Sequence, residues 1–216
     1  MAKHSHWQDE YWLLLIQMYL KQPTGIKPTY YKPLVDLSLE LHIPPKELGE
    51  RMFQLRRLDT PRLERLWNTF AENPKKLQRA VKLLKDMSGF GNANAFYEGV
   101  EVNESWERDF RQIPGRDDLK PVMLIMVLDL YFRLVPITMV ADTPEVVELA
   151  RLMRIKPSVV ADILQVFIYC DPFRKADEMF FDPLLPYCQE VWERFGNARP
   201  QALAAEAALL KEYFRR

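Results

Sequence analysis

The feature that most constrains the fold is an internal repeat, in which a series of apolar segments recurs at a spacing of 112 residues. With that shift and no gap, residues 35–59 fall on residues 147–171, and leucine, isoleucine, valine and methionine meet one another at helical spacing. Segments that repeat in this way are usually supersecondary units that pack as copies. The sequence therefore predicts an all-α fold, built as a tandem duplication of a four-helix unit.

The repeat continues through two further helical segments. A Trp-x-x-Phe motif at Trp67 recurs at Trp192 once an insertion is allowed, and residues 74–85 then meet residues 200–211. Between the copies lies a stretch that contains glycines, acidic residues and aromatic residues. We therefore divide the chain into a first repeat at 1–88, an acidic, aromatic-bearing connection at 89–120 and a second repeat at 121–216.

Residues 33–61 have the spacing of a helix-turn-helix. Apolar residues at helical spacing end at Leu41 and resume at Leu48, and between them Pro44 and Pro45 break one helix and suit the first turn of the next. In a helix-turn-helix the second helix can enter the major groove of DNA. His42 stands where glycine is usual in the turn. The alternative is an ordinary helix pair that binds no nucleic acid.

The two halves of the chain differ in charge, although the net charge is zero. Residues 1–91 carry 15 Lys and Arg against 10 Asp and Glu. Basic residues concentrated in one half indicate an anionic partner, unless they are simply a solvated surface. We expect the first three of the following residues to face base edges and the others phosphates: Lys46, Arg51, Gln54, Arg56, Arg57, Arg62, Arg65, Lys75, Lys76, Arg79 and Lys82.

The second repeat lacks this basic character. The segment equivalent to the second helix of the pair, Ser158 to Cys170, contains no basic residue and is apolar on almost every side. In a soluble protein such a helix is buried. We expect it to pack against the first repeat, the connection or a second copy of the chain, which makes the second repeat a scaffold or an interface.

Composition argues against several other functions. No apolar run reaches the length of about 20 residues that a membrane span requires, and the first ten residues contain no signal-peptide core, so we expect a cytoplasmic protein. Three His and two Cys do not have the spacing of a zinc site, and we read Cys170 and Cys188 as reduced thiols. We expect no metal, no cofactor and no enzymatic activity.

The first repeat resembles a helical module that precedes the nuclease domain in many bacterial HNH-type endonucleases. The residues that carry the resemblance are Trp7, Glu10, Leu15, Tyr19, Leu37, Ser38, Ile43, Pro45, Leu48, Leu58 and Asp59. The second repeat is similar to the same module at 128–132, 144–160 and 170–172, without the leading Trp and Glu. The chain as a whole resembles an uncharacterised bacterial family, which implies no function.

The resemblance implies a helical module that works beside a DNA-cutting domain. An HNH site needs His and Asn residues around a divalent metal, and three His residues cannot build it here. The sequence therefore favours a DNA-binding accessory or regulatory protein that contacts double-stranded DNA through its first repeat. The alternative is a protein-interaction or assembly module without nucleic-acid binding, which forms a homodimer or binds a protein partner through 158–170 or 102–110.

Overall fold

The computed structural model describes residues 7–21, 29–87, 90, 105–174, 181–197 and 200–215, and this part of the chain is all-α, without a strand. The chain divides into two compact units, Met1–Glu107 and Arg108–Arg216. The division falls within the predicted connection, of which residue 89 and residues 91–104 lie outside the described part. Each unit is described by itself.

The described part of the first unit contains a 3-10 helix at Asp9–Tyr11 followed by five α-helices. These are α1 (Trp12–Lys21), α2 (Lys32–Leu41), α3 (Pro45–Arg57), α4 (Pro61–Phe70) and α5 (Pro74–Lys85). The predicted unit of four helices is thus one helix short, because both members of the helix pair are complete helices. A short helix, α7 (Ser105–Phe110), follows at the division between the units.

Proline and polar caps set where these helices begin. Proline occupies the first turn of α3, α4 and α5, where its missing N–H leaves no helical hydrogen bond unmade. The hydroxyl of Thr60 accepts a hydrogen bond from Leu63 N at 3.2 Å, and the amide oxygen of Asn73 accepts one from Lys76 N at 3.1 Å. Both are N-cap bonds of the kind that stabilises a helix start by about 1 kcal/mol.

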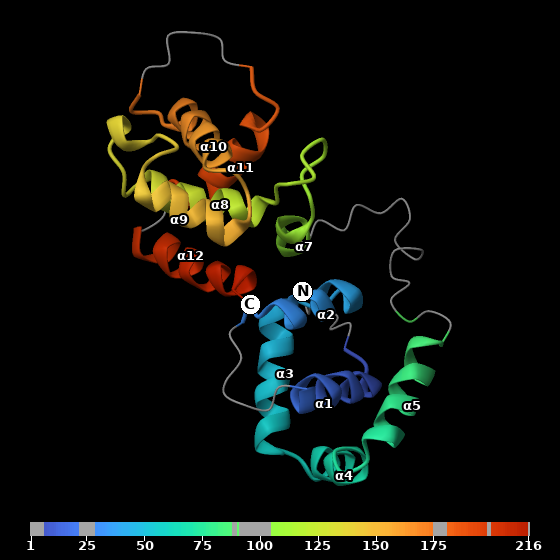
Figure 1. Ribbon diagram of the computed structural model, residues 1–216. Coiled ribbons are helices and arrows are strands. Elements are labelled where there is room, and N and C mark those ends of the chain that lie inside the picture. The colour runs from blue at the N-terminus through green and yellow to red at the C-terminus, as the bar shows by residue number, and fades with distance from the viewer. Residues whose placement is uncertain are drawn as a thin grey trace. The chain divides into compact units, whose positions relative to one another are not determined.

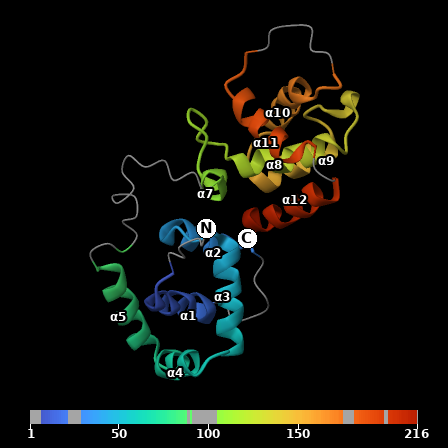
Figure 2. The same ribbon diagram turned by 180° about the vertical axis from the view of Figure 1, so that it is seen from behind.

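Helix α1 is the centre of the first unit. Trp12, Leu14, Leu15 and Ile16 are buried, and α1 packs against α3, α4 and α5. Figures 1 and 2 show α3 and α5 on either side of α1, with α4 joining their far ends. The inner faces of α3 and α5 are therefore committed to the core, and their outer faces point to different sides of the unit.

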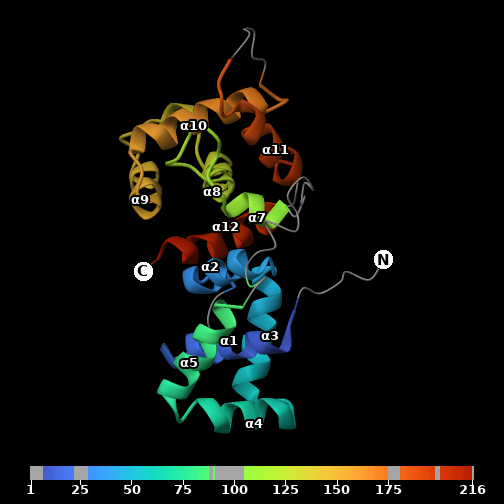
Figure 3. The ribbon, with the colours of Figure 1, turned by 90° about the vertical axis from the view of Figure 1, so that its right-hand side faces the viewer.

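The second unit has a second set of five α-helices in its described part, with a 3-10 helix at Pro136–Thr138. They are α8 (Pro121–Tyr131), α9 (Pro144–Met153), α10 (Pro157–Cys170), α11 (Leu185–Phe195) and α12 (Pro200–Phe214). Helix α8 lies among the other four (Figure 3), and every residue from Val122 to Tyr131 is buried. The buried Asp129 carboxylate in this apolar helix pairs with Arg133 at 3.0 Å.

The two units match in the bounds of α2 and α9 and in the turn that follows each of these helices. Helices α2 and α9 begin and end at positions that differ by the 112 residues of the sequence repeat. Each is followed by a C-cap residue with a left-handed backbone, His42 with φ of 55° and Arg154 with φ of 61°. In this respect His42 does what a glycine does in many such turns.

An aromatic contact also recurs. Tyr19 meets Trp67 edge to face with ring centres 5.5 Å apart, and Tyr131 meets Trp192 in the same way at 5.8 Å. Tyr19 and Tyr131 are related by the same shift of 112 residues. Descent from a tandem duplication stays a prediction, and these shared features support it.

Candidate nucleic-acid interface

Helix α3 is amphipathic, and its exposed face differs from the predicted one. Leu48, Met52 and Leu55 are buried as predicted. The exposed positions on the opposite side are Lys46, Glu50, Phe53, Arg56 and Arg57. Arg51 and Gln54, two of the three residues predicted to face base edges, are only half-exposed. The face of α3 that an incoming partner meets is thus a mixture of basic, acidic and aromatic side chains.

Arg51 is held by contacts within the first unit. Its guanidinium carbon lies 4.9 Å from the centre of the Trp7 ring, and its Nη2 lies 3.7 Å from Glu47 Oε1, one turn earlier on α3. A guanidinium stacked on an aromatic ring and beside a carboxylate is stabilised where it is. A base contact through Arg51 stays a prediction, and it would require Arg51 to leave its contacts with Trp7 and Glu47.

Other basic residues are neutralised or held locally. Arg57 Nε lies 3.3 Å from Asp59, and Arg62 Nη1 lies 2.5 Å from Asp9. Arg65 Nε donates to the Pro61 carbonyl at 3.2 Å. The ammonium of Lys76 lies 5.2 Å from the centre of the Phe70 ring, and that of Lys85 lies 2.6 Å from Glu40. Much of the positive charge of the first unit is therefore already engaged.

Besides Arg65 and Lys76, five of the predicted residues are exposed cations without an ion pair in the described part of the chain. They are Lys46 and Arg56 on α3 and Lys75, Arg79 and Lys82 on α5. Helices α3 and α5 lie on either side of α1 (Figure 1), so these cations fall into two groups, one on each helix. The larger group is the one on α5.

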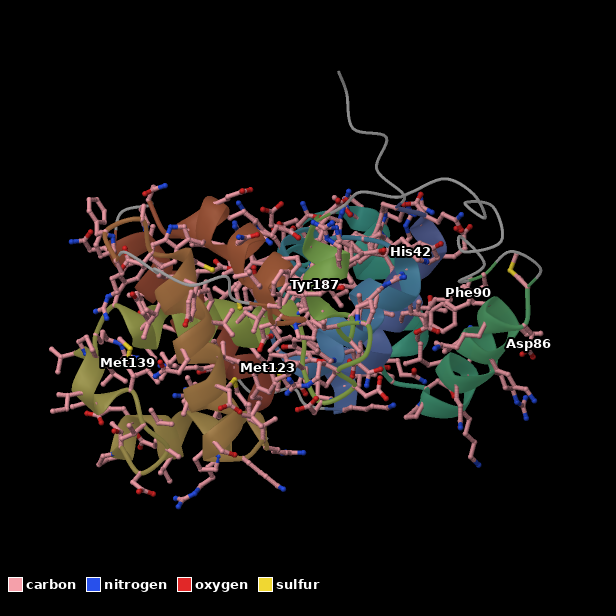
Figure 4. All side chains as sticks on the ribbon, turned by 90° about the horizontal axis from the view of Figure 1, so that it is seen from above. His42, Asp86, Phe90, Met123, Met139 and Tyr187 are labelled. Atoms are coloured by element: carbon pink, nitrogen blue, oxygen red, sulfur yellow. The ribbon has the colours of Figure 1, made fainter. Side chains whose placement is uncertain are left out.

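We call Lys75, Arg79 and Lys82 the α5 ridge. Their spacing places them on one face of the helix, opposite the buried Leu77, Val81 and Leu84. The ridge ends near Asp86, an exposed residue at the edge of the first unit in Figure 4. No described carboxylate pairs with any member of the ridge.

Three exposed apolar side chains beside these cations were not singled out from the sequence. Phe53 on α3 is 46% exposed, Leu83 on α5 is 69% exposed and Met87 after α5 is 61% exposed. The sequence does indicate that Phe53 and Leu83 are exposed, because each falls outside the apolar stripe of its helix. Whether a neighbouring helix covers these side chains depends on the tertiary packing, which the sequence does not show.

In the second repeat, the segment predicted as an interface is used inside its own unit. Helix α10 packs against α8, α9 and α11, and Val160, Ile163, Leu164, Val166 and Phe167 are buried there. Burial was predicted correctly, and the packing partners are helices of the same unit. In the other predicted interface, 102–104 lie outside the described residues and Phe110 is buried against Tyr213 with ring centres 5.1 Å apart.

Chemically reactive groups are sparse in the described residues. They contain no group of three or more His, Cys, Asp or Glu side chains that could hold a metal ion. Cys170 and Cys188 are both free thiols, and burial raises the pKa of Cys170 to about 11. Neither Cys170 nor Cys188 is ionised near neutral pH, so neither is an activated nucleophile. His42, the only described histidine, has its Nδ1 2.6 Å from Glu107 Oε1.

The comparisons with known proteins add no relative. No protein-family model matches the chain, and no significant match was found among curated proteins or among solved structures. As a separate finding, no helix in the described ranges combines the length and hydrophobicity that a membrane span requires. The resemblance to the helical module of HNH-type endonucleases therefore stays a prediction.

Proposed function

We propose that the first unit binds the phosphate backbone of double-stranded DNA through the α5 ridge, and that the protein acts as a non-enzymatic accessory or regulatory factor. The observation that carries the proposal is the charge of the ridge. Lys75, Arg79 and Lys82 are exposed on one helix face and have no ion pair among the described residues. Like charges one turn apart destabilise a helix by about 0.2–0.5 kcal/mol per pair, which an anionic partner relieves.

The length of the ridge suits a polyanion. The seven residue steps from Lys75 to Lys82 rise by about 10 Å along the helix axis, and a DNA duplex carries one negative charge per roughly 1.7 Å. Several phosphates thus lie within reach of three flexible cationic side chains. Contacts of this kind hold a protein on DNA but do not read its sequence.

The same geometry argues for weak sequence preference. Of the residues predicted to reach base edges, Lys46 is exposed, whereas Arg51 is engaged with Trp7 and Gln54 is half-buried. Base-edge contacts carry most of the specificity in direct readout. We therefore expect unrelated duplexes of equal length to bind with similar affinity.

The test is fluorescence anisotropy with a short labelled duplex at about 50 mM and about 200 mM salt, the range over which phosphate contacts weaken steeply. The ridge variant carries Lys75→Gln, Arg79→Gln and Lys82→Gln. Its matched control carries Arg57→Gln, Arg62→Gln and Lys85→Gln, which remove the same charge from cations that already have carboxylate partners.

We expect the ridge variant to lower the slope of log affinity against log salt by about 2–3, or roughly one for each lost phosphate contact. The control should keep most of that slope. Absence of binding by the parent protein at low salt contradicts the proposal. An equal loss in both triple variants also contradicts it, because it attributes binding to net charge rather than to the ridge.

A second candidate function is self-assembly through the second unit. After α8, four large apolar side chains are exposed close together in sequence: Phe132 at 47%, Val135 at 59%, Ile137 at 85% and Val140 at 49%. Exposed apolar patches commonly mark interaction sites, and a net charge of zero does not oppose contact between copies. We expect light scattering to find a dimer that Ile137→Asp converts to monomer. A monomer at high protein concentration contradicts this candidate.

A further inference from the structure

The second unit has a cavity of about 610 Å³ that is lined by α9, the C-terminal end of α12 and the arginine that follows α8. This volume lies within the range of small-molecule sites, about 300–1,000 Å³. Five of its lining residues are basic, namely Arg133, Arg151, Arg154, Lys211 and Arg215. Two are acidic, Glu145 and Glu148. The lining is therefore predominantly cationic.

Two of the five cations are neutralised by carboxylates that do not line the cavity. Arg133 Nη2 lies 3.0 Å from Asp129, and Arg215 pairs with Glu212. Arg151, Arg154 and Lys211 have no ion pair in the described part of the chain. Unpaired cations gathered at one concave site favour an anionic ligand, because each gains a partner there without losing one.

The first unit shows how the equivalent lysine is neutralised when no ligand is needed. Lys85 at the end of α5 pairs with Glu40 of α2 at 2.6 Å. The repeat places Lys211 at the position of Lys85 and Leu152 at the position of Glu40. The second unit thus keeps the lysine and replaces its carboxylate partner by leucine, which leaves the Lys211 ammonium available to the cavity.

The other two unpaired cations have no lysine or arginine at the equivalent positions of the first unit. Arg151 stands at the position of Leu39, and Arg154 stands at the position of His42, whose ring contacts Glu107 in the first unit. Arg154 keeps the left-handed backbone that this turn requires and adds an exposed arginine to the lining of the cavity. Arg151 and Arg154, together with the missing carboxylate partner of Lys211, therefore distinguish the cavity from the same region of the first unit.

We propose that this cavity binds a small phosphate monoester with an apolar body. A terminal phosphate offers three acceptor oxygens, one for each of Arg151, Arg154 and Lys211. Leu149, Leu152 and Phe214 supply an apolar part of the lining, against which a ring or aliphatic chain packs. The two glutamates oppose a polyanion such as DNA, so the site suits a single phosphate group.

Isothermal titration calorimetry of the full chain with phenyl phosphate tests the proposal, with inorganic phosphate and benzoate as comparison probes. We expect one phenyl phosphate per chain. Inorganic phosphate lacks the apolar body and benzoate lacks the third oxygen, so both should bind more weakly. No binding of phenyl phosphate at millimolar concentration, or binding of benzoate with equal affinity, overturns the proposal.

Two variants locate the site. Lys211→Gln removes a cation, and Leu152→Glu supplies the carboxylate that the first unit has at this position, without removing any cation. Each should weaken phenyl phosphate binding about tenfold or more, the size of one charge-assisted hydrogen bond. Lys156→Gln removes an exposed cation that does not line the cavity and should leave binding unchanged.

A further variant guards against a folding defect at the half-buried Lys211. Arg154→Gly removes an exposed side chain at a φ of 61°, where glycine is favoured, so this variant keeps its fold while it loses a cation. It should also bind phenyl phosphate more weakly. Unchanged affinity in folded Leu152→Glu and Arg154→Gly overturns the assignment of the ligand to this cavity.

Discussion

Ser38 in the first unit and Ala150 in the second hold equivalent places, because each backbone carbonyl accepts the N–H of an isoleucine five residues later at 3.1 Å. The two side chains differ in one hydroxyl group. Ser38 is fully buried, and its Oγ has no hydrogen-bond partner among the described residues. A buried polar group without a partner destabilises the folded state by about 1–3 kcal/mol.

We therefore expect Ser38→Ala to raise the free energy of unfolding of the first unit by about 1 kcal/mol. Urea denaturation followed by circular dichroism measures the change. Ser158→Ala, at an exposed position on α10, is the control and should change stability by less than about 0.5 kcal/mol. A loss of stability on Ser38→Ala contradicts the prediction and indicates that the hydroxyl has a partner after all.

Gly49 offers a second comparison between the units. It lies inside α3, and a Cβ added there would meet only Leu34 Cδ2, at the ordinary contact distance of 4.0 Å. The second unit has Ala161 at this position. Glycine inside a helix costs about 1 kcal/mol relative to alanine, so Gly49→Ala should raise the denaturation midpoint.

Gly196 is the contrasting case for the same substitution. A Cβ at Gly196 would lie 2.7 Å from the backbone oxygen of Trp192 and 2.8 Å from its ring. Gly196→Ala should therefore lower the denaturation midpoint of the second unit. If both substitutions moved stability in the same direction, steric contact at Gly196 would not be the deciding factor.

The ion pair between Asp109 and Arg194 should stabilise the second unit more than any exposed pair there. Arg194 donates two hydrogen bonds to the buried Asp109 carboxylate, at 2.8 and 2.7 Å. Removing one partner of a buried pair costs roughly 3–5 kcal/mol, and the partial exposure of Arg194 reduces this, so we expect Asp109→Asn to cost about 2–3 kcal/mol. Thermal unfolding measures it.

Arg108→Gln is the control, since Arg108 pairs with Glu190 at the surface. Exposed ion pairs contribute at most about 1 kcal/mol. Equal losses of stability in Asp109→Asn and Arg108→Gln would mean that the buried pair of Asp109 stabilises the unit no more than an exposed pair.

The two thiols predict a loss of stability at alkaline pH. Burial raises the pKa of Cys170 from 9.0 to about 11, and burial is also the main cause of the raised pKa of Cys188. The contribution of the protonated thiols to the free energy of unfolding is fully present below pH 9, the ordinary thiol pKa. It is lost as the pH rises toward 11, because the unfolded chain then releases the thiol protons more readily than the folded protein. Denaturation at pH 8, 9 and 10 should show this decline, and Cys170→Ser with Cys188→Ala should reduce it.

The local features of the fold follow from the sequence because they depend on neighbours along the chain. The break at Pro44 and Pro45 sets where α3 begins, and the caps at Thr60 and Asn73 set where α4 and α5 begin. The all-α class and the inner faces of the helices were predicted on the same basis. These features need only helical periodicity and the chemistry of proline and polar caps.

The state of each charge was not predictable, because ion pairs join residues far apart in sequence. Arg62 pairs with Asp9 and Lys85 pairs with Glu40, contacts that no periodicity reveals. The cavity of the second unit was missed for the same reason, since its lining comes from three separate segments. The repeat could have directed attention there, because Leu152 replaces Glu40 in the aligned sequence.

Helix α8 is enclosed by four helices of its own unit, and this enclosure has a kinetic consequence. Every residue from Val122 to Tyr131 is buried, so no fraying of a single neighbour exposes its peptide groups fully. Its amide hydrogens should exchange with deuterium only when the whole second unit opens. The slowest-exchanging amides in that unit should therefore report its global free energy of unfolding directly.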